Sequence, residues 1–193
     1  IYVRGLLAAG TVVFPASQWN ASTGSFGPIS GLPLSAAGPF ARTNPRELWA
    51  AVGATVYRRA QVAGAWEPVG GMPDGVRVID LQFEGGAAAG IWALSEAGEL
   101  WRSRDGGMTW QRRYARQNAA RDLLDSMQLA VNPSRVGHVA FYSGRESVVS
   151  LDGGESFQAA AAPRFSQTSG LGVLNSSPFG IEFDPGVPTI LYA

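Results

Sequence analysis

The chain repeats itself about every 45 residues, and this repeat restricts the folds that the sequence can adopt. Similar runs of apolar residues have Leu48, Ile91 and Val139 at equivalent positions, and a shorter run that begins at Ile190 has Leu191 there. The steps between these residues are 43, 48 and 52 positions. Periods of this length are typical of architectures in which each repeat is one supersecondary unit packed against the next. The sequence therefore predicts a series of similar units rather than one irregular core.

Turn signals recur in phase with these runs. Asn44-Pro45, Asn132-Pro133 and Asp184-Pro185 each stand a few residues before an apolar run. Proline fixes φ, and the preceding Asn or Asp favours a turn. We expect each pair to form a hairpin corner between two β-strands.

A sharper signal is an octet that occurs twice, at 103–110 and 150–157. Its Asp can accept hydrogen bonds from backbone N–H groups of its own turn, and its paired glycines can adopt positive φ. Its Ser and Thr hydroxyls can join the two strand ends, and its aromatic residue can fill the space between sheets. The pattern predicts a rigid corner and not a reaction centre. The structural positions are Ser103, Asp105, Gly107, Thr109 and Trp110 in the first octet and Ser150, Asp152, Gly154, Ser156 and Phe157 in the second.

These octets resemble the Asp-box, or BNR, repeat, whose pattern is S-x-D-x-G-x-T-W. The first octet matches every fixed position, and the second has Ser156 for Thr and Phe157 for Trp. The resemblance implies an all-β fold, the β-propeller, with four antiparallel strands per blade and the box between the third and fourth strands. The family includes sialidases, xyloglucan-active hydrolases, sortilin-type receptors and photosystem II assembly factors. Because one fold carries all these activities, function has to be argued from the site.

The repeat divides the 193 residues, which are enough for a single domain, into about four blades. Three blades are expected at 36–68, 76–112 and 125–159, the first with a degenerate box at 60–65. Residues 1–31 and 179–193 are expected to supply the outer and inner strands of one composite blade. That blade would close a ring of four. The alternative is that the chain, which begins with Ile1, is a processed product or a section of a larger propeller.

Composition excludes several classes of function. The 15 arginines balance 15 acidic residues, which argues against a nucleic-acid-binding protein. There is no cysteine, so disulfides, thiolate metal sites and thiol nucleophiles are absent. His138 is the one histidine, and a typical zinc site needs more ligands than that. No apolar run reaches about 18 residues, so we expect no membrane span, and we expect no cofactor or metal.

Two kinds of glycosidase site remain open as alternatives. A xyloglucanase-like enzyme needs two carboxylates that flank a cleft, and the acids expected on inner strands are Asp80, Glu84 and Asp125. Asp80 is notable because it stands in an apolar run, although it can equally be a structural acid. A sialidase needs three arginines for a carboxylate. Those on separate blades are Arg42, Arg77 and Arg145, and these can equally be scattered surface residues.

The segment Gln111–Gln128 differs in kind from the rest of the chain. It lacks Gly and Pro and is rich in helix formers, which predicts a short helical insertion between blades. Its positive patch, suited to an acidic partner or a lipid head group, consists of Arg112, Arg113, Tyr114, Arg116 and Arg121. The alternative is a solvated linker whose arginines pair with Asp122 and Asp125.

Taken together, these patterns favour a non-catalytic binding or scaffold module over an enzyme. The boxes have structural chemistry, no set of catalytic residues converges, and small-residue loops at 36–40, 87–90 and 159–163 suit docking. We expect protein partners in a larger extracytoplasmic, bacterial assembly, either periplasmic or secreted. The alternative is a sialidase- or xyloglucanase-like glycosidase fragment that binds carbohydrate.

Overall fold

The structure is a computed structural model of the chain. It describes residues 2–3, 17–20, 22–28, 32, 40–44, 47–60, 64–85, 90–117, 127–143, 146–160, 181–183 and 191–192.

Three antiparallel sheets of four strands follow one another along the chain. Blade A consists of β4 (Phe40–Asn44), β5 (Glu47–Val52), β6 (Thr55–Arg59) and β7 (Glu67–Gly71). Blade B consists of β8 (Val78–Phe83), β9 (Ile91–Ser95), β10 (Glu99–Ser103) and β11 (Gln111–Ala115). Blade C consists of β12 (Gln128–Val131), β13 (Val139–Ser143), β14 (Glu146–Ser150) and β15 (Gln158–Ala159). In each blade the order of strands across the sheet is their order in the chain.

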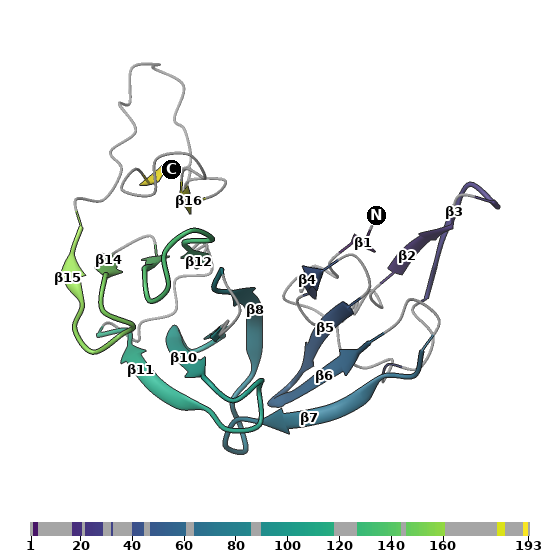
Figure 1. Cartoon of the computed structure of the whole chain (residues 1–193), viewed down its shortest axis with the longest axis horizontal. Helices are drawn as coiled ribbons and strands as arrows, with labels where there is room; N and C mark the ends of the chain where they lie inside the picture. The colour runs from purple at the N-terminus through teal and green to yellow at the C-terminus, as the bar shows by residue number, and fades with distance from the viewer. Residues whose placement is uncertain are drawn as a thin grey trace, which may run out of the picture.

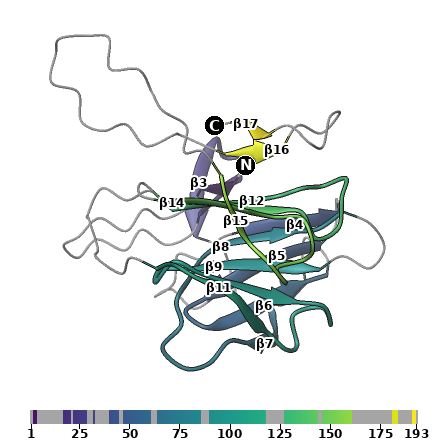
Figure 2. The same cartoon turned by 90° about the vertical axis from the view of Figure 1, so that its left-hand side faces the viewer.

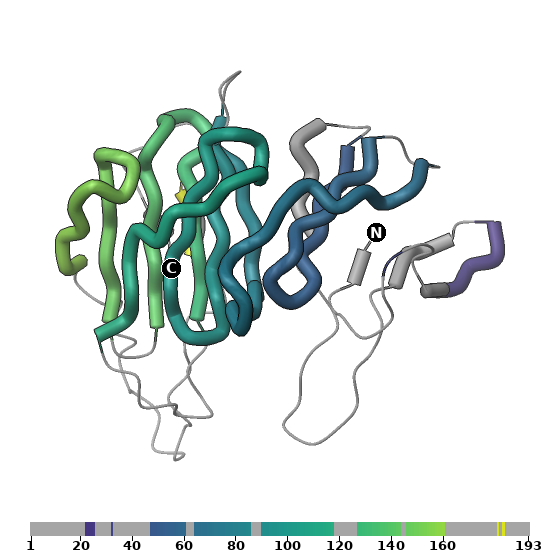
Figure 3. Tube along the Cα trace, turned by 90° about the horizontal axis from the view of Figure 1, so that it is seen from below, coloured from purple at the N-terminus to yellow at the C-terminus, as the bar shows by residue number. Residues whose placement is uncertain are grey.

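The blades are arranged as in a β-propeller. The first strand of each blade is the inner one, and β8 contacts both β4 and β12. Figure 1 shows the sheets following one another around an arc, Figure 2 shows the strands of blade C above β6 and β7 of blade A, and Figure 3 shows blade B between the other two. The prediction of an all-β propeller is therefore confirmed. Both octets lie between the third and fourth strands of a blade, at 103–110 in blade B and 150–157 in blade C.

Two smaller sheets lie at the ends of the arc (Figure 1). The first contains β1 (Tyr2–Val3), β2 (Ser17–Asn20) and β3 (Ser25–Pro28). The second contains β16 (Glu182–Phe183) and β17 (Leu191–Tyr192). Within the described residues they are separate sheets, so the union of both ends in one composite blade stays a prediction.

The hydrophobic core fills the junctions between neighbouring blades. Successive side chains of a strand point to opposite faces of its sheet. Accordingly, β9 directs Ile91 and Ala93 into the junction between blades A and B, and Trp92 and Leu94 into the junction between B and C. All five side chains of β9 are buried because both faces of its sheet are covered.

The prediction of a helix over Gln111–Gln128 was wrong for the part that the structure describes as β11. Leu100 of β10 pairs with Tyr114, and Trp101 pairs with Arg112. Helix propensity is a weak preference, and pairing with β10 overrides it here. Residues 118–126 lie outside the described part of the chain. Among the described residues, no helix is long and apolar enough to cross a membrane.

Candidate functional site at the junctions between blades

Each octet folds as a turn that is closed by its own side chains. In blade B, the Ser103 hydroxyl accepts a hydrogen bond from the Gly107 N–H at 2.8 Å and donates to Asp105 at 2.8 Å. The other end is held by Thr109, whose backbone N–H and hydroxyl donate to Asp105 at 2.9 and 2.5 Å. These bonds, chiefly the one from the Thr109 hydroxyl, lower the pKa of Asp105 to about 2.

The turn of blade C is built in the same way. Ser150 accepts from the Gly154 N–H at 2.8 Å and donates to Asp152 at 2.8 Å. The hydroxyl and the N–H of Ser156 both donate to Asp152, and together with Ser150 they lower the pKa of that carboxyl. We call 103–110 and 150–157 the box turns of blades B and C.

Each box turn docks on the blade that precedes it. Its second glycine has positive φ, 89° at Gly107 and 82° at Gly154. A Cβ atom at Gly107 would lie 3.3 Å from Trp49 of blade A, and one at Gly154 would lie 2.8 Å from Trp92 of blade B. The two tryptophans hold the same position in the second strand of their blades. A repeated contact of box glycine on tryptophan therefore joins successive blades.

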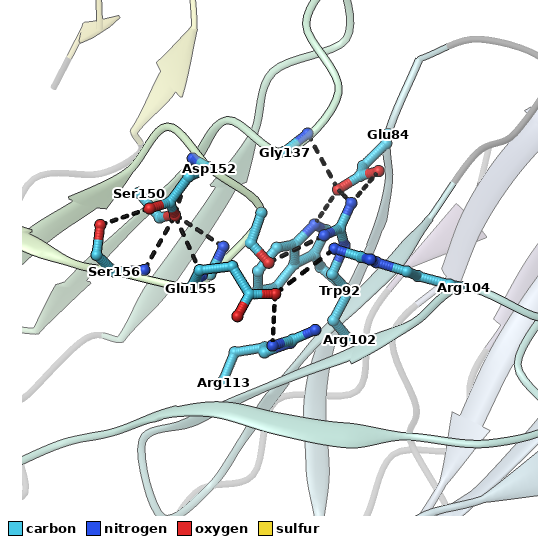
Figure 4. Close-up of polar contacts among 12 residues, drawn as sticks. Glu84, Trp92, Arg102, Arg104, Arg113, Gly137, Ser150, Asp152, Glu155 and Ser156 are labelled. Carbon is cyan, nitrogen blue, oxygen red and sulfur yellow. Dashed lines mark hydrogen bonds and ion pairs between the residues drawn. The ribbon is translucent and has the colours of Figure 1, made fainter.

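A buried ion pair lies at the junction between blades B and C (Figure 4). The Glu84 carboxylate accepts from Arg102 Nη2 at 2.7 to 2.8 Å, from Trp92 Nε1 at 2.7 Å and from the Gly137 N–H of blade C at 3.3 Å. Arg102 Nη1 donates to the Gly153 carbonyl of box turn C at 2.9 Å. The side chain of Glu84 is 0% exposed and that of Arg102 is 5% exposed. The pair thus ties the inner strand of blade B to two loops of blade C.

A second link between the same blades joins their turns at the surface. The Glu155 carboxylate of box turn C lies 3.0 Å from Arg113 Nη1 on β11 and 3.9 Å from Arg104 Nη2 in box turn B. Figure 4 shows Glu155 between these two arginines.

The acids expected to act as glycosidase carboxylates have local partners. Glu84 is enclosed by the buried contacts above. Asp80 is 8% exposed and accepts from the Leu81 N–H at 2.9 Å and from Gln82 Nε2 at 3.2 Å. Asp125 lies outside the described residues. The two described carboxylates both belong to the β8 segment and do not face each other across a cleft from distant blades.

In the described part of the structure, the arginines considered for a sialidase site do not form a cluster. Arg77 is exposed and lies 3.5 Å from Glu96. Arg42 belongs to β4, and Arg145 lies outside the described part. Burial, followed by the charge of Arg135, lowers the pKa of His138. The described residues contain no cluster of three groups that could hold a metal ion.

The expected positive patch is divided by strand geometry. The register of β10 with β11 shifts between Leu100 and Trp101, which leaves Arg113 as the extra residue of a bulge. Arg112 is 56% exposed and lies 2.9 Å from Glu99 of the neighbouring strand. Arg121 lies outside the described residues.

Tyr114 belongs to the junction between blades B and C rather than to a surface patch. Its ring lies 4.8 Å from Phe157 and 5.8 Å from Phe141, and its hydroxyl donates to Glu146 at 3.1 Å. Burial, followed by the Glu146 contact, raises the pKa of Tyr114 to about 12.

Sequence reasoning did not single out the arginines that stack on the docking tryptophans. Arg58 lies 5.8 Å from the ring of Trp49, and Arg102 lies 5.3 Å from the ring of Trp92. The available signal was the repeat itself, because each arginine pairs directly across the sheet with its tryptophan. In blade C the corresponding pair is Ala140 with Val149.

Among known proteins, the chain shows similarity to solved structures only, and this similarity is weak. No family model and no curated protein matches the sequence. Over 67% of its length the chain is similar to a solved structure described as YCF48 bound to D1 peptide, with 20% identity and a TM-score of 0.49. Over 68% it is similar to YCF48 from Cyanidioschyzon merolae, with 15% identity and a TM-score of 0.45. The chain spans 42% and 39% of the lengths of these two proteins.

Proposed function

We propose that this protein is a non-catalytic binding module that holds an acidic segment of a partner protein on the outer strand of blade B. We place it in an extracytoplasmic bacterial assembly in which the propeller acts as a scaffold. The residues proposed to contact the partner are Arg112, Arg116 and Arg121, while Arg113 and Tyr114 hold the underlying strand in place.

The observation that carries the non-catalytic part is the environment of Glu84. A glycosidase carboxylate must reach its substrate and exchange a proton or attack the sugar. Glu84 instead receives hydrogen bonds from Arg102, Trp92 and Gly137, and its side chain has no exposed surface. This arrangement suits a structural charge that fixes two blades.

The binding part rests on the position of Arg112. Its strand, β11, is the fourth of blade B, and among the described strands it pairs with β10 alone. The guanidinium is 56% exposed, and its contact with Glu99 is an exposed one. Exposed ion pairs contribute little energy, so a carboxylate of a partner can compete for this guanidinium at small cost.

Binding can be tested with a labelled peptide rich in Asp and Glu, titrated by fluorescence anisotropy at low salt. We expect Arg112→Gln with Arg116→Gln to weaken binding by about tenfold, which corresponds to the loss of one or two charge-assisted hydrogen bonds. Arg77→Gln is the matched control because Arg77 is also half-exposed and paired with a glutamate. Equal binding by both variants and the parent would contradict the proposal for β11.

The enzyme alternative is tested separately with aryl glycosides and xyloglucan oligosaccharides. We expect no turnover above the uncatalysed rate. Turnover that Asp80→Asn or Glu84→Gln abolishes in a folded variant would replace the scaffold proposal by a glycosidase.

A further inference from the structure

We propose that blade A contains a second site, in which Arg59 and Trp66 bind a carboxylate side chain of an acidic peptide. This inference goes beyond the proposed function because it concerns a different blade and stands whether or not β11 binds a partner. Arg59 is the last residue of β6, and Trp66 directly precedes β7.

The register of the sheets shows which residue Arg59 replaces. Arg59 pairs with Leu48 in blade A, as Ser103 pairs with Ile91 in blade B. In blade C the corresponding residue is Ser150, which pairs with Val139. Arg59 therefore takes the position of the serine that opens each box turn.

In the box turns this position donates a hydrogen bond to a carboxylate. Ser103 donates to Asp105 and Ser150 donates to Asp152, each at 2.8 Å. The residue two places after Arg59 is Gln61, and the segment 60–65 contains no acidic residue. At the box position blade A thus has a stronger donor than the other blades, and the segment 60–65 has no acid that could take the role of the box Asp.

Two of the three guanidinium nitrogens of Arg59 are buried without an acceptor among the described residues. The residue is 5% exposed, and its guanidinium carbon lies 4.9 Å from the ring of Trp66. Among the described residues, no group accepts a hydrogen bond from its Nε or Nη2 atom, and both atoms are buried. Burying a charge without a partner costs free energy. An anion that reaches this guanidinium would form charge-assisted hydrogen bonds, which are stronger than hydrogen bonds between neutral groups.

The local charge also favours an acidic ligand from outside this part of the chain. Residues 1–67 contain five arginines and two acids, Glu47 and Glu67, so their net charge is +3. Glu47 lies 3.8 Å from Arg58, the residue before Arg59, so this acid already has an arginine as its partner. The remaining 126 residues contain ten arginines and thirteen acids, a net charge of −3.

The geometry points to a carboxylate on a peptide rather than to phosphate. At the same register position the fold itself accommodates an Asp side chain in box turns B and C. The guanidinium fork matches the planar carboxylate and can bind it with two parallel hydrogen bonds. The indole ring of Trp66 covers one face of the Arg59 guanidinium. A ligand therefore has to approach in the plane of the guanidinium, as a carboxylate does.

The test is a calorimetric titration of each protein with acetyl-tetraglutamate amide, which measures the affinity of every variant. The chemical shift of the Arg59 Nε–H resonance then locates the ligand in the parent and in Arg58→Met. Acetyl-tetraglutamine-glycine tests a terminal carboxylate, and inorganic phosphate tests a free anion. Arg59→Met removes the charge while keeping a long apolar side chain, so the variant should fold and melt at or above the parent temperature. Arg58→Met is the matched control, since Arg58 also stacks on a tryptophan but has an acidic partner.

We expect saturable binding of the glutamate peptide by the parent and by Arg58→Met, and at least about tenfold weaker binding by Arg59→Met. Binding of the terminal carboxylate peptide at the same resonance also supports the site and identifies a C-terminus as its ligand. Equal binding by Arg59→Met and the parent would overturn the proposal. So would a response of the Arg59 resonance to phosphate alone, or no response to any of the three probes.

Discussion

The Arg102 guanidinium donates a hydrogen bond to the Gly153 carbonyl at 2.9 Å, from the third strand of blade B to the box turn of blade C. The same guanidinium holds Glu84, so one side chain connects three segments that lie far apart in the sequence. Box turn C is therefore positioned by the preceding blade as well as by its own hydrogen bonds. The stability of the junction should depend on this charge pair more than on any exposed ion pair.

We expect Glu84→Gln to lower the free energy of unfolding by about 3–5 kcal/mol, because it leaves the Arg102 charge buried without its counter-ion. Urea denaturation at pH 7 measures this change. The control is Glu96→Gln, which removes an exposed pair with Arg77 and should cost less than about 1 kcal/mol. Similar losses in the two variants would show that the buried pair has no special role.

The box turns should make stability depend on pH in the acidic range. The pKa of Asp105 falls from 3.8 to about 2 in the folded protein. The unfolded chain therefore binds more protons between these values, and stability decreases as the pH falls through this window. Asp152 acts in the same direction, because its pKa is also lowered.

Thermal unfolding between pH 5 and pH 2 tests this dependence. Asp105→Asn should lower the melting temperature at pH 5 and should flatten its decline toward pH 2. Asp74→Asn is a suitable control, since Asp74 is an exposed turn residue outside the boxes. A decline as steep in Asp105→Asn as in the parent would assign the acid sensitivity to other groups.

The sequence allowed the blades and turns to be predicted because both depend on local chemistry. A turn such as Ser103–Trp110 is closed by side chains at most a few residues apart, and its glycines are needed where φ is positive. The period of the apolar runs located the second strands of the blades, since each run fills the space between two sheets.

The blade junctions and the identity of β11 could not be predicted in the same way. Glu84 and Arg102 are 18 residues apart, and Gly153 follows 51 residues after Arg102, so their contact exists only once the blades have stacked. Gln111–Ala115 is composed of residues compatible with a helix, and its pairing with β10 decides the outcome. A strand bulge then directs Arg113 toward Glu155, which no linear pattern indicates.

The contact of Gly154 with Trp92 should make this glycine irreplaceable. Alanine there combines a φ of 82° with a Cβ atom 2.8 Å from Trp92 Cη2 and 2.9 Å from Arg113 Cβ. Gly106→Ala is the control, because its φ is also positive, at 70°, but a Cβ atom would meet nothing within 4 Å. We expect the control to cost about 1–2 kcal/mol for the left-handed conformation alone.

For Gly154→Ala we expect a further loss of about 1–3 kcal/mol from overpacking at the junction. Urea denaturation of both variants gives the difference directly. If the two variants unfold at the same urea concentration, the docking of the turn on Trp92 contributes nothing beyond its backbone conformation.

The last prediction concerns Gln82, whose side-chain amide joins the inner strands of blades B and C. Its Nε2 donates to the Leu129 carbonyl at 2.6 Å, and its Oε1 accepts from the Val131 N–H at 3.0 Å. The amide thus satisfies two backbone groups of β12, as a neighbouring strand would. Gln82→Met keeps the length of the side chain but leaves both groups without this partner, so we expect a loss of about 1–3 kcal/mol. Hydrogen exchange should report the loss locally, with faster exchange of the Val131 amide than of the Ala140 amide, whereas Gln111→Met on the exposed strand β11 should change neither rate. Unchanged protection of Val131 in Gln82→Met would mean that the two inner strands are held together by their apolar contacts alone.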